Sequence, residues 1–446
     1  MVAARNKPST DLADHVAAFF VPRLQHGRRV CVGLSGGRDS VALLHALATV
    51  RARTPSLELS ALHVHHGLSA KADQWAEFCA ALCHSLDIPC HLARVTVSGI
   101  AEEGLEAAAR GARYAAFAKC SADWLALAHH RDDQAETLML NLLRGSGVNG
   151  LSAMPEERVL AGTPVRLVRP LLSVARREIE HWLVDRQVAW VDDESNADTQ
   201  LRRNYLRHEI LPMLAGYFPD PTGSLARAAM HFAEHAALAE EIAATDACGL
   251  VEGDSIRLDR FNALAPARRA NLLRFQFRRQ GLRMPDSRYL QEILRQLAEA
   301  ASDASPEFLL DGCRLRVSRN RLHCCSTTSV SLATIAWEGE SVLPWAGGQL
   351  HFAMTEGRGL SRQRLEEASV SIRARVGGER LQIDAERPRR SLKHLFQESE
   401  VPLWERENRP LLWCGDDLAW VSGLGCDAGY LARPGEAGVL PIWRCD

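Results

Sequence analysis

The chain has 446 residues, which is more than one ordinary hydrophobic core needs and predicts two to three domains. Its formal net charge is −2, so the global charge neither indicates nor excludes a nucleic-acid partner, and any such surface must be local. The twelve cysteines include no Cys-x-x-Cys pair, which predicts reduced, packed thiols in a cytoplasmic protein. No run of about eighteen apolar residues is present, so no membrane span is predicted.

The first half of the sequence alternates strand-like runs with helical patterns. The strand-like runs cover residues 30–34, 57–64, 89–97 and 124–128. Each run is followed by a segment whose apolar residues recur with the period of a helix. This alternation predicts an α/β fold with a doubly wound, mostly parallel, Rossmann-like sheet. Active sites of such folds lie beyond the carboxyl ends of the strands.

The pattern changes after residue 218, so three domains are predicted. Residues 1–218 form the domain with the sheet. Residues 219–328 contain a long Ala-rich helical pattern and an Arg-dense helical stretch, which indicate a mainly helical domain. Residues 329–446 alternate β-type runs, such as residues 411–414 and 418–421, with a short helix near 392–397, which predicts a small α/β module.

One motif lies between the first strand and the helix after it, and it comprises Ser35, Gly36, Gly37, Arg38, Asp39 and Ser40. Two glycines allow backbone N–H groups to converge on phosphate oxygens, and the following helix adds the positive end of its dipole. A Ser-Gly-Gly tripeptide alone is equally typical of a surface turn. The strand before it and the helix after it favour a loop that binds a nucleotide triphosphate. No lysine follows the glycines, so the signature of phosphate-transferring NTPases is absent.

A second constellation follows the fourth strand. His129, Asp133 and Glu136 are spaced i, i+4, i+7, which would place an imidazole and two carboxylates on one face of a helix. Acidic residues in a first helical turn also stabilise the helix dipole, and for Asp132 this structural role is favoured. For the three-residue set a functional role is favoured, because the same face would meet the phosphate loop.

The loop resembles the Ser-Gly-Gly-x-Asp-Ser loop of the N-type ATP pyrophosphatases, which cleave ATP between its α and β phosphates. Further motifs lie at residues 129–137, 144–151, 193–198, 203–212, 377–380, 393–396 and 401–406. Through these motifs nearly the whole chain resembles the tRNA(Ile)-lysidine synthetases, with the middle domain matching least distinctly. His65 stands where many relatives carry asparagine.

The resemblance implies that ATP adenylates the ring carbonyl oxygen of a wobble cytidine and that the ε-amine of free L-lysine then displaces AMP. The Ser35–Ser40 loop and a Mg²⁺ ion would stabilise the leaving pyrophosphate, and Asp39 would help to hold that ion. Arg113 would bind phosphate or the substrate carboxylate, although a solvated helix charge is the simpler interpretation of this residue. Asp133 or Glu136 would orient lysine and accept its proton.

The implied RNA partner is a tRNA(Ile) with a CAU anticodon. Two arginine-rich segments are interpreted as phosphate-binding surfaces, and the candidate residues are Arg203, Asn204, Arg207, Arg389, Arg390, Lys393 and Arg406. For the cluster at residues 268–279, a solvated face and an RNA surface are equally favoured. The last two domains would therefore contribute to tRNA binding. A homodimer is compatible with the sequence, which does not define the oligomeric state.

Two alternative functions stay open on the sequence alone. A tRNA thiolation enzyme on the same fold would share the loop, but its chemistry generally requires paired cysteines that are absent here. A non-catalytic, nucleotide-gated RNA-binding protein would keep the loop and have no need of Asp133 or Glu136. Turnover of ATP to pyrophosphate in the presence of tRNA separates an enzyme from such a binding protein.

Overall fold

The computed structural model describes residues 11–100, 104–253, 255–299, 306–318, 320–326, 333–399, 401 and 403–445. It divides into two compact units, Met1–Glu241 and Ile242–Asp446, and each is described by itself below. The predicted domain limits at 218/219 and 328/329 stay predictions, and the second of them lies outside the described residues. In the described part of the chain, no helix is both long enough and apolar enough to cross a membrane.

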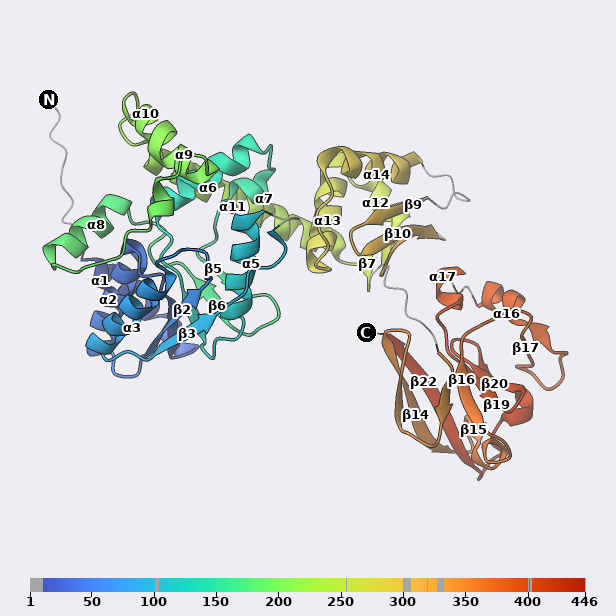
Figure 1. Ribbon diagram of the computed structural model, residues 1–446. Coiled ribbons are helices and arrows are strands. Elements are labelled where there is room, and N and C mark those ends of the chain that lie inside the picture. The colour runs from blue at the N-terminus through green and yellow to red at the C-terminus, as the bar shows by residue number, and fades with distance from the viewer. Residues whose placement is uncertain are drawn as a thin grey trace. The chain divides into compact units, whose positions relative to one another are not determined.

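The first unit is built on a six-stranded sheet with the order β3-β2-β1-β4-β6-β5. Neighbouring strands run parallel, except that β5 pairs antiparallel with β6. The predicted doubly wound, mostly parallel sheet is therefore confirmed (Figure 1). Its strands are β1 (Arg29–Gly33), β2 (Glu58–His65), β3 (Cys90–Arg94), β4 (Trp124–Ala126), β5 (Glu157–Val159) and β6 (Arg166–Val168).

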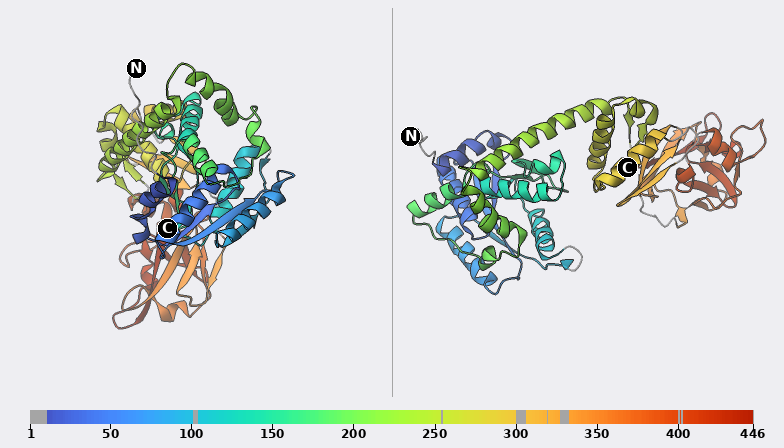
Figure 2. Two further views of the ribbon diagram at one scale, coloured as in Figure 1. Left: turned by 90° about the vertical axis from the view of Figure 1, so that its left-hand side faces the viewer. Right: turned by 90° about the horizontal axis from the view of Figure 1, so that it is seen from above.

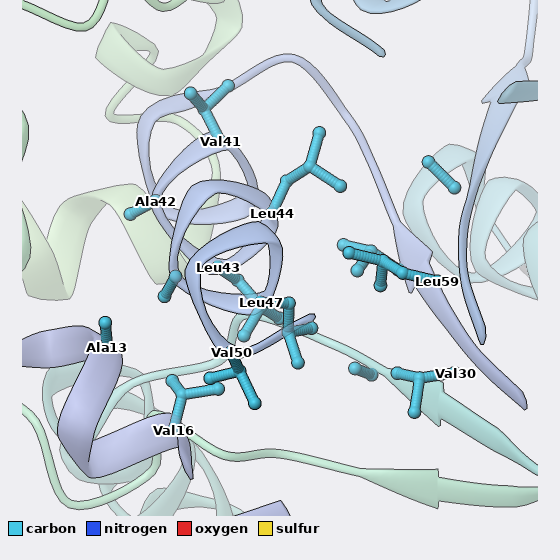
Figure 3. Close-up of a cluster of buried hydrophobic side chains, with 14 of the residues drawn as sticks. Ala13, Val16, Val30, Val41, Ala42, Leu43, Leu44, Leu47, Val50 and Leu59 are labelled. Atoms are coloured by element: carbon cyan, nitrogen blue, oxygen red, sulfur yellow. The ribbon is translucent and has the colours of Figure 1, made fainter. Parts of the chain in front are cut away.

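Helices cover both faces of this sheet because successive strand residues point to opposite faces. Val30 and Val32 of β1 pack in one core with α1, α2, α3 and α8, whereas Cys31 packs in a second core with α5. Figure 3 shows part of the first core, which contains Leu47 of α2 and Leu59 of β2. These helices are α1 (Leu12–Phe20), α2 (Arg38–Arg53), α3 (Ala72–Ser85), α5 (Leu105–Phe117) and α8 (Arg176–Asp185).

Two groups of helices complete this unit. After β4 come α6 (Arg131–Leu143) and α7 (Val148–Leu151). Later in the chain, α9 (Arg202–Tyr205), a π-helical turn η3 (Leu206–Ile210) and α10 (Leu211–Ala215) follow one another without a break. The long helix α11 (Pro221–Ala247) comes next and is continuous (Figure 2), and its residues after Glu241 belong to the second unit.

The first part of the second unit combines helices with a five-stranded antiparallel sheet of order β7-β8-β11-β10-β9. The predicted Arg-dense helical stretch is present as α13 (Pro266–Arg279). The helices α12 (Leu258–Ala263) and α14 (Ser287–Glu299) and the sheet have no counterpart in the sequence prediction. Its short strands are β7 (Val251–Glu252), β8 (Ser255–Arg257), β9 (Glu307–Leu310), β10 (Cys313–Ser318) and β11 (Arg321–Ser326). A disulfide joins Cys313 to Cys324 across β10 and β11, which corrects the expectation that every cysteine is a free thiol.

In the described residues of the last part of the chain, two antiparallel sheets share a core of residues such as Leu350, Ile372 and Trp420, and a small third sheet pairs β17 (Arg380–Leu381) with β18 (Arg390–Ser391). The predicted strand runs near 411–414 and 418–421 and the predicted short helix are confirmed. One sheet contains β12 (Ile335–Trp337), β16 (Val370–Arg373), β19 (Leu411–Cys414), β20 (Asp417–Val421) and β21 (Gly425–Cys426). The other contains β13 (Val342–Trp345), β14 (Gly348–Glu356), β15 (Leu360–Ser361) and β22 (Ala437–Cys445), and the helices are α15 (Arg362–Leu365), α16 (Leu392–Glu398) and α17 (Leu403–Arg406).

Candidate active site

The glycine-rich loop joins β1 to α2 and is held by its own serines. The Ser40 hydroxyl donates to the Gly37 carbonyl at 2.9 Å and accepts from the Ser35 backbone N–H at 3.2 Å. The Ser35 hydroxyl in turn accepts from the Gly37 N–H at 3.3 Å. Because these bonds fix the turn from within, its backbone is preorganised and does not depend on a ligand for its shape.

The two glycines are needed for different reasons. Gly36 has a φ of +85°, and a Cβ at this position would lie 3.2 Å from the Cys79 Sγ of α3. A side chain here would therefore be both strained and crowded. Gly37 is the N-cap of α2, so the first turn of that helix, with its unsatisfied N–H groups and positive dipole end, begins directly beside the loop. This arrangement suits an anion.

The side chains after the glycines point to different partners. The Arg38 guanidinium lies 3.0 Å from the Glu180 carboxylate of α8 and 3.3 Å from Asp39. Asp39 also lies 3.6 Å from Nε2 of His130. The carboxylate of Asp39 therefore connects the loop to the segment that follows β4.

His130 joins Asp39 to α6. Its Nε2 lies 3.6 Å from the Asp133 carboxylate as well as 3.6 Å from Asp39. His130 is the N-cap of α6, and its backbone N–H donates to Asp133 at 3.0 Å. One imidazole therefore bridges two carboxylates that come from different helices, and its position is fixed by the cap of α6.

The prediction that His129 lies on one helical face with Asp133 and Glu136 is wrong. The helix begins at Arg131, so His129 precedes it and is not in helical phase with Asp133 and Glu136. Its Nδ1 instead accepts from the Arg169 guanidinium at 3.3 Å. Burial lowers the pKa of His129 to about 3, so this imidazole is neutral. The adjacent His130, which sequence reasoning missed, occupies the bridging position.

Protonation states in this group follow from burial and charge together. Burial opposes ionisation of Asp39, but the contact with His130 and the charge of Arg38 prevail and lower its pKa to about 2. Asp133 is also buried, yet the charge of His130 leads a set of contacts that lower its pKa. His130 is buried too, and its two carboxylate neighbours raise its pKa. At Glu136 burial prevails and raises the pKa.

Two of the predicted RNA-binding arginines face these carboxylates. The Arg207 guanidinium donates to Glu136 at 2.7 Å and to Asp133 at 3.1 Å. Arg203 lies 3.4 Å from Glu136 and donates to the Thr137 hydroxyl at 2.8 Å. Asn204 is buried, and its amide donates to the Asp198 carbonyl at 3.0 Å. The helix from α9 to η3 is thus attached to α6 by charge.

Two further residues border the site from β2 and α5. His63, at the carboxyl half of β2, is buried, and its Nδ1 lies 2.9 Å from the Leu34 carbonyl just before the loop. Arg113 is exposed on α5, and its Nε donates to Nε2 of His66 at 3.4 Å. The structure therefore brings Arg113 to the carboxyl end of β2, at the sheet edge where the loop also begins.

A divalent cation would have few protein ligands here. The described residues contain no group of three or more His, Cys, Asp or Glu side chains arranged to hold a metal ion. Mg²⁺ commonly binds through one or two carboxylates together with substrate phosphates and water. The ionised Asp39 carboxylate in the first turn of α2 fits this mode, because its oxygens lie beside a loop suited to phosphate.

The predicted basic residues of the last region differ in their surroundings. Arg390 pairs with Glu398 at 2.8 and 2.5 Å, and Arg389 lies 3.6 Å from Asp427. Arg406 is 6% exposed and donates to the Val401 carbonyl at 2.8 Å, so it supports the local fold and does not face solvent. Lys393 is exposed on α16.

Comparison with known proteins covers the whole chain. Residues 8–214 match a PP-loop domain, residues 257–323 match the TilS substrate binding domain, and residues 370–443 match the TilS substrate C-terminal domain. A tRNA(Ile)-lysidine synthase of Nitrosomonas europaea is 41% identical over 100% of this chain and 98% of the relative. One of Aromatoleum aromaticum is 40% identical over 96% and 99%. One of Chromobacterium violaceum is 43% identical over 93% and 94%.

Proposed function

Because this chain belongs to the tRNA(Ile)-lysidine synthase family, we propose that it uses ATP to convert the wobble cytidine of a tRNA(Ile) with a CAU anticodon to lysidine. It is a ligase that forms a carbon–nitrogen bond. The observation that carries this proposal for the chain's own residues is the single imidazole of His130, which lies 3.6 Å from Asp39 of the loop helix and 3.6 Å from Asp133 of α6. Asp39 of α2 would serve the adenylation step, and Asp133 of α6 would serve the attack by lysine.

The reaction has two balanced steps. In the first, the ring carbonyl oxygen of cytidine attacks the α-phosphorus of ATP, and the bond to the β-phosphate oxygen breaks to release pyrophosphate. In the second, the ε-amine of free L-lysine, after losing a proton, attacks the activated ring carbon and AMP leaves with its bonding electrons. The net products are lysidine, AMP and pyrophosphate.

The loop from Ser35 to Ser40 is proposed to bind the phosphates of ATP. Its N–H groups and the first turn of α2 would stabilise negative charge on the departing pyrophosphate in a geometry that is already fixed by Ser40. When bound, Mg²⁺ would neutralise phosphate charge, and Asp39 is the residue proposed to hold it. Arg38 would retain Glu180 as its partner and add positive charge at the rim of the loop.

Asp133 and Glu136 are proposed to receive the ammonium group of lysine. The Arg207 guanidinium already lies against both carboxylates, which supports the view that this pair attracts an organic cation. Their opposite pKa shifts suit different tasks. The lowered pKa of Asp133 keeps it ionised for binding, whereas the raised pKa of Glu136 makes it the better proton acceptor.

The RNA partner would contact both units. Arg203, Asn204 and Arg207 are proposed to act near the wobble nucleotide through the helix that they attach to α6. In the last region, Arg389, Arg390 and Lys393 are proposed to contact phosphates, with Arg406 supporting them from within. Arg113 would bind phosphate or the lysine carboxylate beside His66.

Mass analysis of the wobble nucleoside tests the proposed function. The full chain is incubated with a tRNA(Ile) transcript bearing CAU, ATP and isotopically labelled lysine, and the nucleoside is expected to gain the mass of lysine less one water. Omission of lysine, or a transcript with uridine at the wobble position, is the control. Sulfur in the product would indicate a thiolation enzyme, and tight RNA binding without any ATP turnover would indicate a binding protein.

Three further statements stay proposals. We place this reaction in the cytoplasm. A homodimer is one proposed assembly, and sedimentation of the chain with and without tRNA tests it. Residues 1–218 are proposed as the catalytic domain, with tRNA contacts supplied by the regions 219–328 and 329–446.

A further inference from the structure

A group of arginines surrounds Tyr114 in the first unit. The guanidinium carbons of Arg110 and Arg158 each lie 5.1 Å from the centre of the Tyr114 ring. Arg110 also donates to the Tyr114 hydroxyl at 3.4 Å. Arg169 is only 2% exposed and interacts electrostatically with Tyr114. We call Arg110, Arg158 and Arg169 with Tyr114 the tyrosine–arginine cluster.

The charges of this cluster are not balanced within the described part of the chain. Neither Arg110 nor Arg158 forms an ion pair with a described carboxylate, and Arg169 bonds instead to His129 and to the Pro155 carbonyl, the latter at 2.6 Å. These like charges repel one another, most of all at the buried Arg169. An anion placed among them would remove that repulsion.

The cluster borders the candidate active site. Arg169, which follows β6, donates to His129, and His129 immediately precedes the bridging His130. Arg110 and Arg113 lie one helical turn apart on α5, and Arg113 reaches His66 after β2. The positive surface therefore runs along α5 beside the sheet edge where ATP and the wobble nucleotide are proposed to bind.

The number of cations indicates which anion fits. The carboxylate of free lysine carries one negative charge, and the phosphates of ATP already have the Ser35–Ser40 loop. A stretch of RNA brings successive phosphates, and a guanidinium can hold each one with two parallel hydrogen bonds. Arginine planes also offer stacking surfaces for unpaired bases. An RNA strand therefore matches both the charge and the side-chain types of the cluster.

We propose that the tyrosine–arginine cluster binds consecutive backbone phosphates of the RNA strand next to the nucleotide that enters the active site. Arg110 and Arg158 would contact the phosphates, and buried Arg169 would hold Tyr114 and His129 in place as a positioning residue. This inference rests on the proposed function, because it assumes that an RNA nucleotide is the substrate.

Binding of the tRNA transcript by the full chain tests this proposal without ATP or lysine. The variant Arg110→Ala/Arg158→Ala is expected to bind roughly tenfold more weakly, and the slope of log K against log salt should fall by about 0.7 for each phosphate that is no longer bound. The charge-preserving variant Arg110→Lys/Arg158→Lys should recover most of the slope. The matched control is Arg166→Ala, because Arg166 is on β6 but already pairs with Glu157 at 2.6 Å.

Each other outcome overturns the proposal in a specific way. A raised KM for lysine with unchanged RNA binding would assign the cluster to the lysine carboxylate, and a raised KM for ATP would assign it to the triphosphate. If the variant has the unfolding midpoint of the wild type and also binds RNA and turns over like the wild type, the cluster has no role in binding RNA. If the double variant binds the transcript with the expected loss of affinity and of salt dependence but the wild type forms no lysidine, the proposal for the cluster stands and only the proposed function fails.

Discussion

Two sets of arginines in the first unit are in opposite electrostatic situations. Arg207 and Arg203 lie against the carboxylates of Asp133 and Glu136, at distances of 2.7 to 3.4 Å. Arg110 and Arg158 lie over an aromatic ring at 5.1 Å and have no ion-pair partner among the described residues. Paired guanidinium groups have their charge satisfied and chiefly fix geometry, whereas unpaired ones retain their attraction for an incoming anion.

The largest effect is expected from a change in the carboxylates that His130 bridges, and this change leaves the tyrosine–arginine cluster intact. Asp39→Asn is expected to lower the rate of pyrophosphate release by at least roughly a hundredfold, because the neutral amide would no longer hold the Mg²⁺ ion that is proposed to neutralise the reacting phosphates. Affinity for tRNA should stay unchanged, since the tyrosine–arginine cluster is intact. Pyrophosphate assays and filter binding measure the two quantities. Glu180→Gln, which removes the partner of Arg38, is the control, and near-normal turnover of a folded Asp39→Asn protein would refute the assigned role.

Asp133→Asn should act on the second step of the reaction. The amide keeps the shape of the carboxylate but loses its charge, so the KM for lysine should rise roughly tenfold or more while the KM for ATP stays constant. Adenylated tRNA is then expected to accumulate, which rapid quenching and mass analysis would detect. If the variant instead loses ATP binding with unchanged lysine dependence, Asp133 belongs to the nucleotide half of the site and Glu136 becomes the residue that holds lysine.

His130→Gln should weaken the connection between the loop and α6 in a pH-dependent manner. Burial opposes the charge of His130, but Asp133 and Asp39 prevail and raise its pKa, so the protonated form stabilises the folded state. That stabilisation is fully present below the unfolded pKa of about 6.5 and is lost as the pH rises through the raised folded value. The difference in unfolding midpoint between wild type and variant should therefore shrink with rising pH. A difference that grows with pH would contradict the proposed ionic bridge.

The smallest effect is expected in the last region, where a paired and an unpaired cation lie close together in the sequence. Arg390→Ala should change the salt slope of tRNA binding by less than about 0.7, because its charge is already matched by Glu398. Lys393 has no ion-pair partner among the described residues, so Lys393→Ala should lower the slope by close to the full value of about 0.7. Equal slopes for the two variants would show that internal pairing does not govern which cations reach RNA.

Much of the catalytic unit could be predicted because local signals determine it. The Ser35–Ser40 loop, its flanking strand and helix, and the acidic start of α6 all follow from short-range pattern and glycine chemistry. The roles of neighbouring histidines could not be separated in the same way. His129 and His130 differ only in which one caps α6, and a shift of one residue in the helix start exchanges a neutral buried imidazole for the bridging one.

Long-range pairing limited the remaining predictions. From the sequence alone, Arg203 and Arg207 are interpreted as RNA ligands. Their carboxylate partners could not be recognised because they are distant along the chain, with Arg207 and Glu136 separated by 71 residues. In the middle region, Cys313–Ser318 does alternate buried and half-buried residues as a strand should, but strands this short are easily masked by adjacent strong helices. The disulfide between Cys313 and Cys324 depends on that missed pairing.

The π-helical turn η3 (Leu206–Ile210) has a consequence for how relatives of this chain can diverge. A turn of this kind contains one residue more than an α-helical turn, and each residue advances a helix by about 100°. Deletion of a single residue after Arg207 would restore α-helical phase. It would leave both arginines on their carboxylates while it rotates α10 and its exposed Met213 to a different azimuth. The outer face of this helix can thus be redirected by insertion or deletion alone, independently of substitutions in the catalytic centre.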